Sequence, residues 1–415
     1  MIGWIVIVST QLITFLLWSI AKSQNPAFGL AQAGTQIMAL LGIMSLIWTF
    51  VLAVRAKVIE KMFGGLDIVY KVHHILGGLA LVFLINHALL LIVGAMPENM
   101  IAYYLLPGTS LAYTMGIISL YIMLFLIILT IYVKLPYRFW KWSHEWMGLV
   151  IIFGGLHAVL ISSDTSRYMP LRYWILGWSA IATISFLYKR FAYYFVGIKK
   201  YKIVRSGRDR ELLVISMEAE GAPIDFSPGQ FGFFSIPSKK RDDHAFSILG
   251  IDGKKLIVGI KVIGNFTEKL TELKAGSELI VKGPYGTFGE KMKDAKHAVW
   301  IAGGIGITPF LSMAKAVRDD QRVEMYFCAR VLPPKVITEP FANLAMRNPR
   351  FVWLPCETTK SGRVTGKMIF EKTGLDKNAT YMLCGPKEMM ESMAEQLAEL
   401  GIKRSHIIYE DFAFK

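Results

Sequence analysis

Long apolar runs fill the first half of the chain and then stop. Six of them lie before residue 200, at 2–20, 34–54, 69–94, 112–133, 146–162 and 171–195. Each is near the roughly 20 residues that an α-helix needs to cross a bilayer. Beyond residue 200, strand-like and helix-like stretches of ordinary charge alternate. The pattern predicts a six-helix transmembrane bundle at 1–198, a β-barrel domain at 199–293 and an α/β domain at 294–415.

Composition and charge support this division and add an orientation. The 415-residue chain is 53% hydrophobic, too apolar for an ordinary soluble protein. Lys and Arg concentrate in three connections, at 55–71, 134–141 and 189–200. The positive-inside bias therefore predicts a multi-pass plasma-membrane protein with both termini and the soluble domains in the cytoplasm. The net charge of +15 partly reflects these groups, so we expect no binding of nucleic acid.

The start of the chain and its cysteines suit this location. The first run lacks a basic start and an evident cleavage site, so we expect a retained helix rather than a signal peptide. The cysteines, Cys328, Cys356 and Cys384, all fall in the soluble half without metal-ligand spacing. That distribution suits a reducing compartment.

Histidines stand out in the apolar half. His73 and His87 lie 14 residues apart in the third run, and His144 and His157 lie 13 apart in or beside the fifth. Fourteen helical steps span roughly 20 Å and return to within roughly 40° of the same face. On the charge reading, His73 and His144 share the inner level and His87 and His157 the outer level. Two imidazole pairs at two depths predict two b-type haems, bound without a Cys-x-x-Cys-His motif.

The sequence also permits other roles for these histidines. They can be hydrogen-bonding residues between helices, whereas zinc lacks a complementary carboxylate or thiolate. Gly77 and Gly148 each follow a histidine by four residues, which favours His73 over His74 and leaves room for a flat group. Thirteen steps on a straight helix leave His157 roughly 140° from His144. We expect a kink near Gly154 and Gly155, or haems at different azimuths.

Two stretches of the expected barrel carry flavin-like features. In "HAFSIL", an aromatic and a hydroxyl on one strand can present Ser247 to a flavin ring. In "GNFT", Gly264 to Thr267 form a glycine turn that opens a short helix, whose backbone N–H groups suit a pyrophosphate. Taken singly, each stretch is equally an ordinary strand or turn.

The last domain has two strand-turn-helix units. In "AGGIGITP", Gly303, Gly304 and Gly306 allow a dinucleotide phosphate to approach, and Thr308 and Pro309 open the next helix. In "CGP", Cys384, Gly385 and Pro386 end another strand, although Cys384 can equally be a small packing residue.

The order of these parts resembles a known family. "HAFS", "GNFT", "KGPYGTFG", "AGGIGITP", "CGP" and the terminal "YEDFAFK" follow the ferredoxin–NADP reductase pattern. Joined to a six-helix, two-haem membrane domain, the chain resembles the NADPH oxidase and ferric reductase superfamily, in particular its bacterial NADPH-oxidase homologues. It departs from the family at Ala245, where proline is usual, and at Leu91, where animal oxidases carry a further histidine.

The resemblance implies a set of ligands. Haem iron would be held by the metal ligands His73, His87, His144 and His157. FAD would contact His244, Phe246, Ser247, Gly264 and Thr267, and Lys261 and Asn265 are further expected cofactor-binding residues. NADPH or NADH would contact Gly303, Gly304, Gly306, Thr308, Pro309, Arg330, Arg363, Cys384, Gly385 and Pro386. Phe412, which fits the pattern better than Phe414, would cover the flavin and act in catalysis with Cys384 and Ser247.

The implied activity is electron transfer from cytoplasmic NAD(P)H through FAD and two haems to an acceptor across the membrane. Oxygen, giving superoxide, and a ferric chelate are the competing acceptors, and no obligate protein partner is evident. Two alternatives are a haem-bearing anchor that serves a quinone or partner protein and a regulated transporter. A transporter should show broken helices or acidic residues in mid-membrane, and neither is evident in the sequence.

Overall fold

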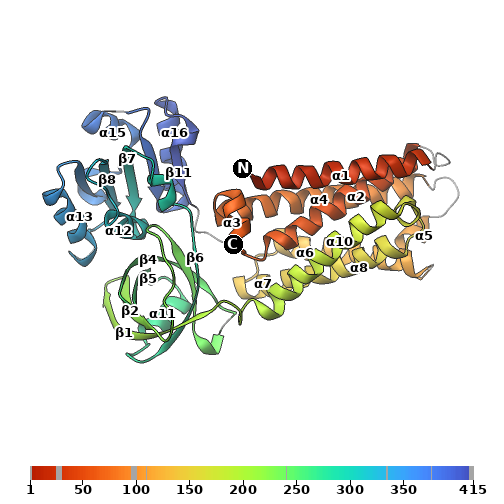
Figure 1. The fold of residues 1–415 in the computed structure, drawn as a ribbon, viewed down its shortest axis with the longest axis horizontal. Helices are drawn as coiled ribbons and strands as arrows, with labels where there is room; N and C mark the ends of the chain where they lie inside the picture. The colour runs from red at the N-terminus through yellow and green to blue at the C-terminus, as the bar shows by residue number, and fades with distance from the viewer. Residues whose placement is uncertain are drawn as a thin grey trace. The chain divides into compact units, whose positions relative to one another are not determined.

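The computed structural model describes residues 2–24, 30–94, 101–108, 110–239, 241–332, 335–374 and 376–410. Its contacts divide the chain into two compact units, Met1–Tyr193 and Tyr194–Phe414. The first unit is helical, and the second contains a barrel followed by an α/β sheet (Figure 1).

The long helices of the first unit coincide with the predicted apolar runs. Its helices are α1 Ile2–Gln24, α2 Leu30–Leu52, α3 Lys57–Phe63, α4 Leu66–Gly94, α5 Ile101–Leu105, α6 Leu111–Ile131, α7 Tyr137–Glu145, α8 Met147–Leu160, α9 Asp164–Arg167 and α10 Met169–Leu187. A π-helical turn, Tyr188–Ala192, follows α10. The main packing partners are α2 with α4 and α6 with α8. Gly42 of α2 permits the first of these contacts, because a Cβ there would meet the Leu84 side chain at 2.9 Å.

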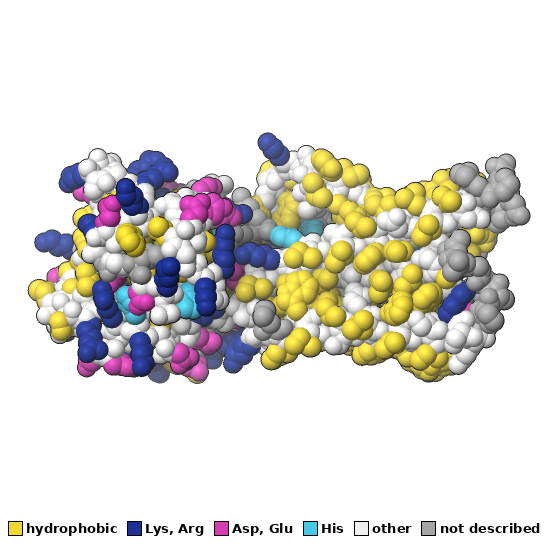
Figure 2. Space-filling model, turned by 90° about the horizontal axis from the view of Figure 1, so that it is seen from above, with side chains coloured by type: hydrophobic (Ala, Val, Ile, Leu, Met, Phe, Trp, Pro, Cys, Tyr) yellow, Lys and Arg dark blue, Asp and Glu magenta, His cyan; other side chains and the backbone are white. Residues whose placement is uncertain are grey.

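Five described segments are long and apolar enough to cross a bilayer: Ile2–Gln24, Gln32–Leu52, Leu66–Gly94, Leu111–Ile131 and Tyr137–Leu160. The last of them joins α7 and α8, and α10 occupies the sixth predicted run but falls outside this group. Large apolar side chains on these helices are exposed, including Leu16, Val82 and Phe125. Figure 2 shows such side chains covering the visible face of the helical unit, whereas charged side chains gather over the second unit.

The barrel follows from alternating burial along short strands. Six strands close it in the order β1-β2-β5-β4-β3-β6. Their bounds are β1 Lys199–Asp209, β2 Leu212–Ala219, β3 Phe231–Ser235, β4 His244–Asp252, β5 Lys255–Lys261 and β6 Glu278–Tyr285. Inward-facing residues such as Ile215, Val258 and Val281 are fully buried and form one core. The short helix α11, Asn265–Thr271, adds Phe266 and Leu270 to that core.

The remaining strands form a parallel sheet in the order β11-β10-β7-β8-β9. They are β7 His297–Gly303, β8 Arg322–Ala329, β9 Phe351–Glu357, β10 Thr380–Cys384 and β11 Ile407–Tyr409. The helices of this region are α12 Thr308–Ala314, α13 Lys335–Arg347, α14 Thr358–Ser361, α15 Gly366–Thr373 and α16 Lys387–Glu399. Strand order reverses at β7, between β8 and β10, so the carboxyl ends of β7 and β10 form the crevice where such sheets bind ligands.

A histidine at the amino end of β7 ties strands together. His297 Nδ1 lies 2.7 Å from the Asp376 carboxylate and its Nε2 lies 3.3 Å from the fully buried Glu324 carboxylate. Glu324 and then Asp376 raise the pKa of His297 above its usual value, although burial and Arg322 oppose them. His297 in turn lowers the pKa of Asp376.

This cluster predicts a pH-dependent loss of local stability. Because the folded state raises the pKa of His297, its contribution is complete below about pH 6.5 and disappears as pH rises through the folded-state pKa. We expect the charged pairs of His297 to stabilise the folded state by about 1 kcal/mol, because Asp376 is partly exposed. At pH 6, amide exchange across β7 should be about fivefold slower in the native chain than in His297→Gln. At high pH the exchange rates of the native chain and of His297→Gln should converge. An equal difference between them at both pH values would contradict the stabilising role of protonated His297.

Candidate functional site

The structure brings the four membrane histidines together as two pairs. The ring centroids of His73 and His144 are 6.2 Å apart, and those of His87 and His157 are 6.4 Å apart. α4 provides one member of each pair, and α7 and α8 provide the others. His74 is exposed and its ring lies 5.8 Å from that of His73. The arrangement has the two levels that the sequence spacing predicts.

Backbone carbonyls orient three of the four imidazoles. His73 Nδ1 lies 2.9 Å from the Thr49 carbonyl oxygen and His87 Nδ1 lies 2.9 Å from that of Thr35, both on α2. His157 Nδ1 lies 2.8 Å from the Ala112 carbonyl oxygen of α6. A carbonyl only accepts, so each Nδ1 carries the proton and donates it. The lone pair is then on Nε2, the usual arrangement for a metal-binding histidine.

The separation within each pair matches two imidazoles on one metal ion. A bond from a metal to an imidazole nitrogen is about 2 Å long. The ring centre lies about 1.1 Å behind that nitrogen, given ring bonds close to 1.33 Å. Two rings on opposite sides of one iron should therefore have centroids about 6 Å apart, as both pairs do. The described residues hold no group of three or more His, Cys, Asp or Glu that would suit another metal. The paired histidines fit a bis-imidazole haem.

The helix that carries His144 and His157 is interrupted, but not where the sequence suggested. α7 ends at Glu145, α8 begins at Met147, and Trp146 between them has a ψ of −9°. Gly154 and Gly155 lie inside α8, where Cβ atoms would meet Ser119 and Ser179. The expected kink at these glycines is therefore wrong. The interruption at Trp146 places the two ligands on separate helical segments, α7 and α8.

The two glycines that follow the inner histidines have different roles. A Cβ on Gly77 would meet nothing within 4 Å, so the expected open space exists beside His73. A Cβ on Gly148 would lie 2.1 Å from the Phe186 ring. The expectation of room at Gly148 is wrong, since that face packs against Phe186 of α10.

Three features of the pairs have no counterpart in the sequence reasoning. The Trp140 ring stacks on His144 at 5.4 Å with an interplanar angle of 11°. Gly116 of α6 allows His157 to approach, because a Cβ there would lie 2.8 Å from the His157 ring. The carbonyl acceptors on α2 and α6 are the third feature. The Trp140 spacing of four residues is a usable sequence signal, whereas a backbone acceptor leaves none.

On the barrel, the "HAFSIL" motif forms the start of β4. His244 stacks on Phe266 of α11, with centroids 3.9 Å apart and planes at 18°, and shares a 3.0 Å hydrogen bond with Asp242. Phe246 is also nearly parallel to Phe266, at 6.2 Å. Ser247 pairs with Phe231 of β3 and is half-buried. β4 and the start of α11 are therefore joined by a stack of rings beside the candidate flavin residues.

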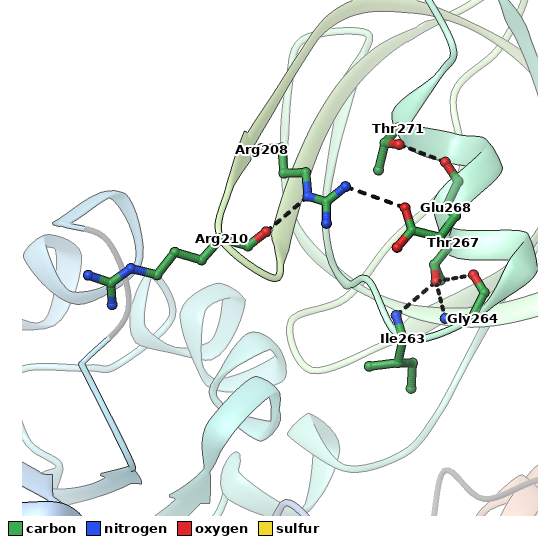
Figure 3. A network of polar contacts seen from close by, with 7 residues as sticks. All are labelled: Arg208, Arg210, Ile263, Gly264, Thr267, Glu268 and Thr271. Carbon is green, nitrogen blue, oxygen red and sulfur yellow. Dashed lines mark hydrogen bonds and ion pairs between the residues drawn. The ribbon is translucent and has the colours of Figure 1, made fainter.

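The "GNFT" turn is held by its own threonine, as Figure 3 shows. Thr267 Oγ1 accepts from the N–H groups of Ile263 and Gly264, both at 3.0 Å, and donates to the Gly264 carbonyl at 2.9 Å. The hydroxyl is therefore used within the turn. The N–H groups of Asn265 and Phe266, in the first turn of α11, remain the groups suited to an anion.

A cleft of 980 Å³ lies at the carboxyl ends of β7 and β8. Four cationic residues line it from separate elements: Arg210, Lys261, Arg330 and Arg363. Gly303, Gly304 and Pro386 also line it, so it gathers several residues expected to contact NAD(P)H. Arg210 was missed by sequence reasoning. It sits in the β1–β2 turn with φ of +53°, and in Figure 3 its side chain points away from the Arg208 network.

The glycines at this edge act in two ways. Gly304 has φ of +54° and open space where a Cβ would be, so it fits the expected approach of a ligand to backbone. At Gly306 a Cβ would lie 2.2 Å from the Cys384 carbonyl oxygen, and at Gly385 it would lie 3.1 Å from Gly303. Gly303, Gly306 and Gly385 therefore let the turns after β7 and β10 pack together.

The other predicted nucleotide residues have fixed positions. Thr308 begins α12 with Pro309, and its hydroxyl donates to the Ile305 carbonyl at 2.8 Å. Cys384 ends β10 and is 3% exposed. Burial, with a smaller effect of Glu410, raises the pKa of its thiol, so it stays neutral. Phe412 and Phe414 lie outside the described residues.

Comparisons with known proteins agree with this architecture. Residues 38–155 match the family described as "Ferric reductase like transmembrane component", and residues 300–395 match "Oxidoreductase NAD-binding domain". A component of the Na(+)-translocating NADH-quinone reductase of Pseudoalteromonas atlantica is 26% identical over 214 residues, covering 44% of this chain and 52% of the relative. The same component from Pseudomonas paraeruginosa is 28% identical over 165 residues, covering 36% and 40%. The chain thus spans about half or less of the length of these relatives.

Solved structures show weaker likeness. A flavohemoglobin from Malassezia yamatoensis is 19% identical with a TM-score of 0.48, covering 78% of this chain and 92% of that one. A cytochrome P450 reductase from Amycolatopsis is 19% identical with a TM-score of 0.46, covering 52% and 69%.

Taken with the two family matches, the helices, barrel and sheet define a membrane protein with a flavin- and NAD-binding type of reductase fold. The chain joins a ferric-reductase-like transmembrane domain to a ferredoxin-reductase-like domain. This order of parts is similar to that of the NADPH oxidase and ferric reductase family.

Proposed function

We propose that this protein carries electrons across a membrane, from NAD(P)H through FAD and two b-type haems to an acceptor on the far side. The observation that supports the proposal most is that four histidines of α4, α7 and α8 form two imidazole pairs. The ring centroids are 6.2 Å apart in His73–His144 and 6.4 Å apart in His87–His157. When bound, FAD takes up the hydride of NAD(P)H and passes electrons on singly, and haem iron carries one electron at a time.

The chain's own part in this activity is to hold each group in place. At the outer level, Thr35 and Ala112 accept the Nδ1 protons of His87 and His157, which directs both Nε2 atoms toward the space between the helices. At the inner level, Thr49 does the same for His73, and Trp140 stacks on His144. The distance between the inner and outer histidine pairs is set by α4, because the 14 residues from His73 to His87 rise about 21 Å along the helix.

The position and charge of the cleft support the binding of NAD(P)H there. The cleft beside Gly303 and Gly304 is lined by four cationic side chains that suit the phosphates of NAD(P)H. Three carboxylates, those of Asp209, Glu211 and Glu388, also line it, and Glu211 pairs with Lys261 at 3.3 Å. We place this cleft in the cytoplasm because Lys and Arg concentrate at 55–71, 134–141 and 189–200, the connections that precede the soluble unit or lie on its side of the membrane.

Oxygen is the acceptor that we favour, reduced by one electron to superoxide. His87 and His157 would hold the outer haem from two sides, so that iron would be closed to an acceptor and the haem would supply single electrons without binding it. Oxygen is small enough to need no built pocket. A ferric chelate is the second candidate, supported by the match of residues 38–155 to a ferric-reductase-like component.

The proposal is tested by the absorption spectrum of the purified full-length protein. We expect two haems per chain in a quantitative haemochrome assay, and reduction of both when NAD(P)H is added with FAD in the absence of oxygen. A chain that binds no haem would overturn the proposal, and haem that NAD(P)H cannot reduce would favour an anchor that serves another protein.

Arg330 and Arg363 give a prediction about nucleotide choice. Both line the cleft, on either side of the β8 carboxyl end. A charged hydrogen bond to the 2′-phosphate contributes about 1.5–3 kcal/mol, which corresponds to about tenfold or more in affinity. We expect Arg330→Ala and Arg363→Ala each to raise KM for NADPH about tenfold with little change for NADH.

A matched control is Arg347→Ala, on the exposed end of α13 and outside the cleft. It should leave both KM values unchanged. Equal increases for NADPH and NADH in the cleft variants would show that these arginines bind a phosphate common to both nucleotides.

A further inference from the structure

Two cysteines face each other across neighbouring strands at the edge of the nucleotide cleft. β8 and β9 are parallel, and their register places Cys328 directly opposite Cys356. Tyr326 and Leu354, two residues earlier on each strand, pack in the same core cluster. Side chains two residues apart share a face, so both thiols leave the sheet on that same face.

The spacing suits a covalent bond between the two sulfurs. Neighbouring strands lie about 4.8 Å apart, within the range of about 4.4–6.8 Å between Cα atoms that disulfides span. Both cysteines are free thiols in this structure and each is half-buried. The two thiols also interact electrostatically, since Cys356 contributes to the raised pKa of Cys328.

Each thiol touches the turn that carries Arg363. Cys356 Sγ lies 3.1 Å from Ser361 Oγ and 3.5 Å from the Gly362 carbonyl oxygen. The Val364 backbone, in the same segment, slightly offsets the rise in the pKa of the Cys328 thiol. Cys328, Arg363 and Val364 all line the cleft. The dithiol therefore lies under the segment 361–364 and helps to fix it.

We propose that Cys328 and Cys356 form a reversible disulfide that lowers the affinity of the cleft for NADPH. This inference rests on the nucleotide site of the proposed function. Joining the sulfurs to each other withdraws both from segment 361–364. Arg363 then loses its fixed position at the cleft, and nucleotide binding weakens.

The oxidant is a peroxide. Cys356 thiolate attacks one peroxide oxygen, the O–O bond breaks, and a sulfenic acid forms as an alcohol or water leaves. Cys328 then attacks the Cys356 sulfur, the S–S bond forms, the S–O bond breaks and water leaves. Two thiols and one hydrogen peroxide thus give one disulfide and two waters. Burial raises the pKa of Cys328 to about 12, so Cys356 is the thiol that reacts first.

A peroxide also connects the switch to the proposed activity. Two superoxide ions and two protons disproportionate to hydrogen peroxide and oxygen. Accumulating peroxide would oxidise the pair and slow further uptake of NAD(P)H, and a dithiol such as dithiothreitol would reverse it by exchange. Peroxide derived from the superoxide that the protein produces would thereby regulate the binding of its own electron donor.

The test uses the purified full-length protein, treated with hydrogen peroxide and digested under non-reducing conditions. Mass spectrometry should find one peptide pair that joins Cys328 to Cys356, while the buried Cys384 stays a thiol. Titration with NADPH without an acceptor should show about tenfold weaker binding after oxidation, the loss expected for one charged hydrogen bond. Dithiothreitol should restore it.

Cys328→Ser and Cys356→Ser are matched variants. In each variant, peroxide treatment should leave the affinity for NADPH at the value that the same untreated variant shows. The inference is overturned if both thiols survive peroxide, if Cys356 pairs only between molecules, or if the disulfide forms without a change in affinity. None of these readouts needs haem or an acceptor, so failure here is distinguishable from failure of the proposed electron transfer.

Discussion

The purified His87→Ala variant should contain one haem per chain, half of the two per chain proposed for the native protein. His87 supplies one side of the outer pair, and its partner His157 lies on α8 with a ring 6.4 Å away. A haem held by one imidazole would lose one of the two protein ligands that retain it. His157→Ala should have the same effect, because each pair needs both members. His73→Ala and His144→Ala should remove the inner haem instead.

His74→Ala is the matched control for His73→Ala. The two histidines are adjacent on α4, but His74 is exposed whereas His73 is bonded to Thr49 and faces His144. Haem content should therefore stay at two in His74→Ala. Loss of a haem in His74→Ala, with none lost in His73→Ala, would show that the register of α4 is misassigned.

Cytochrome c should be reduced by the protein with NAD(P)H and FAD even when superoxide dismutase is present. With His87 and His157 on both sides of the outer site, no open coordination position remains to select oxygen. Leu91, one turn beyond His87, adds no polar group that could do so. Acceptors that reach the edge of the site should therefore compete, with oxygen giving superoxide and ferric chelates being reduced directly.

The decisive comparison is cytochrome c reduction in air with and without the dismutase, and again without oxygen. We expect partial inhibition by the dismutase and continued reduction in anaerobic buffer, with a ferric chelate behaving in the same way. Complete inhibition, with no anaerobic reduction of either acceptor, would mean that the outer site selects oxygen. Ferric reduction without any oxygen consumption would make the protein a ferric reductase.

The membrane helices and the strand-end motifs could be predicted because their signals are local. An apolar run of about 20 residues specifies a helix in a bilayer, and His73 and His87 share a face by helical periodicity alone. Likewise, β7 ends at Gly303 and β10 at Cys384, where the glycine motifs indicate. The short helices α3 and α5 were missed, since a few helical turns leave little periodic signal, and α7 was taken as the start of the helix that continues as α8.

Features that depend on a second segment could not be predicted. The space at Gly148 is filled by Phe186 of α10, far along the chain. The proton acceptors of the histidines are backbone carbonyls, which every residue has. The pairing of Cys328 with Cys356 needs the register of β8 and β9. The break at Trp146 was placed at the wrong residues because glycine was taken as the breaker, yet Gly154 and Gly155 serve helix packing.

That break has a consequence for how the protein responds to its lipids. α7 exposes Tyr137, Phe139 and Trp142 beside Arg138 and Lys141, a composition suited to the headgroup layer. His144 therefore lies near the end of the Tyr137–Leu160 span that is rich in aromatic and basic residues, whereas His157 lies further along the same span, in α8. A change in headgroup charge or bilayer thickness acts on the first imidazole and spares the second. The midpoint potential of the inner haem should thus vary with lipid composition while that of the outer haem stays constant.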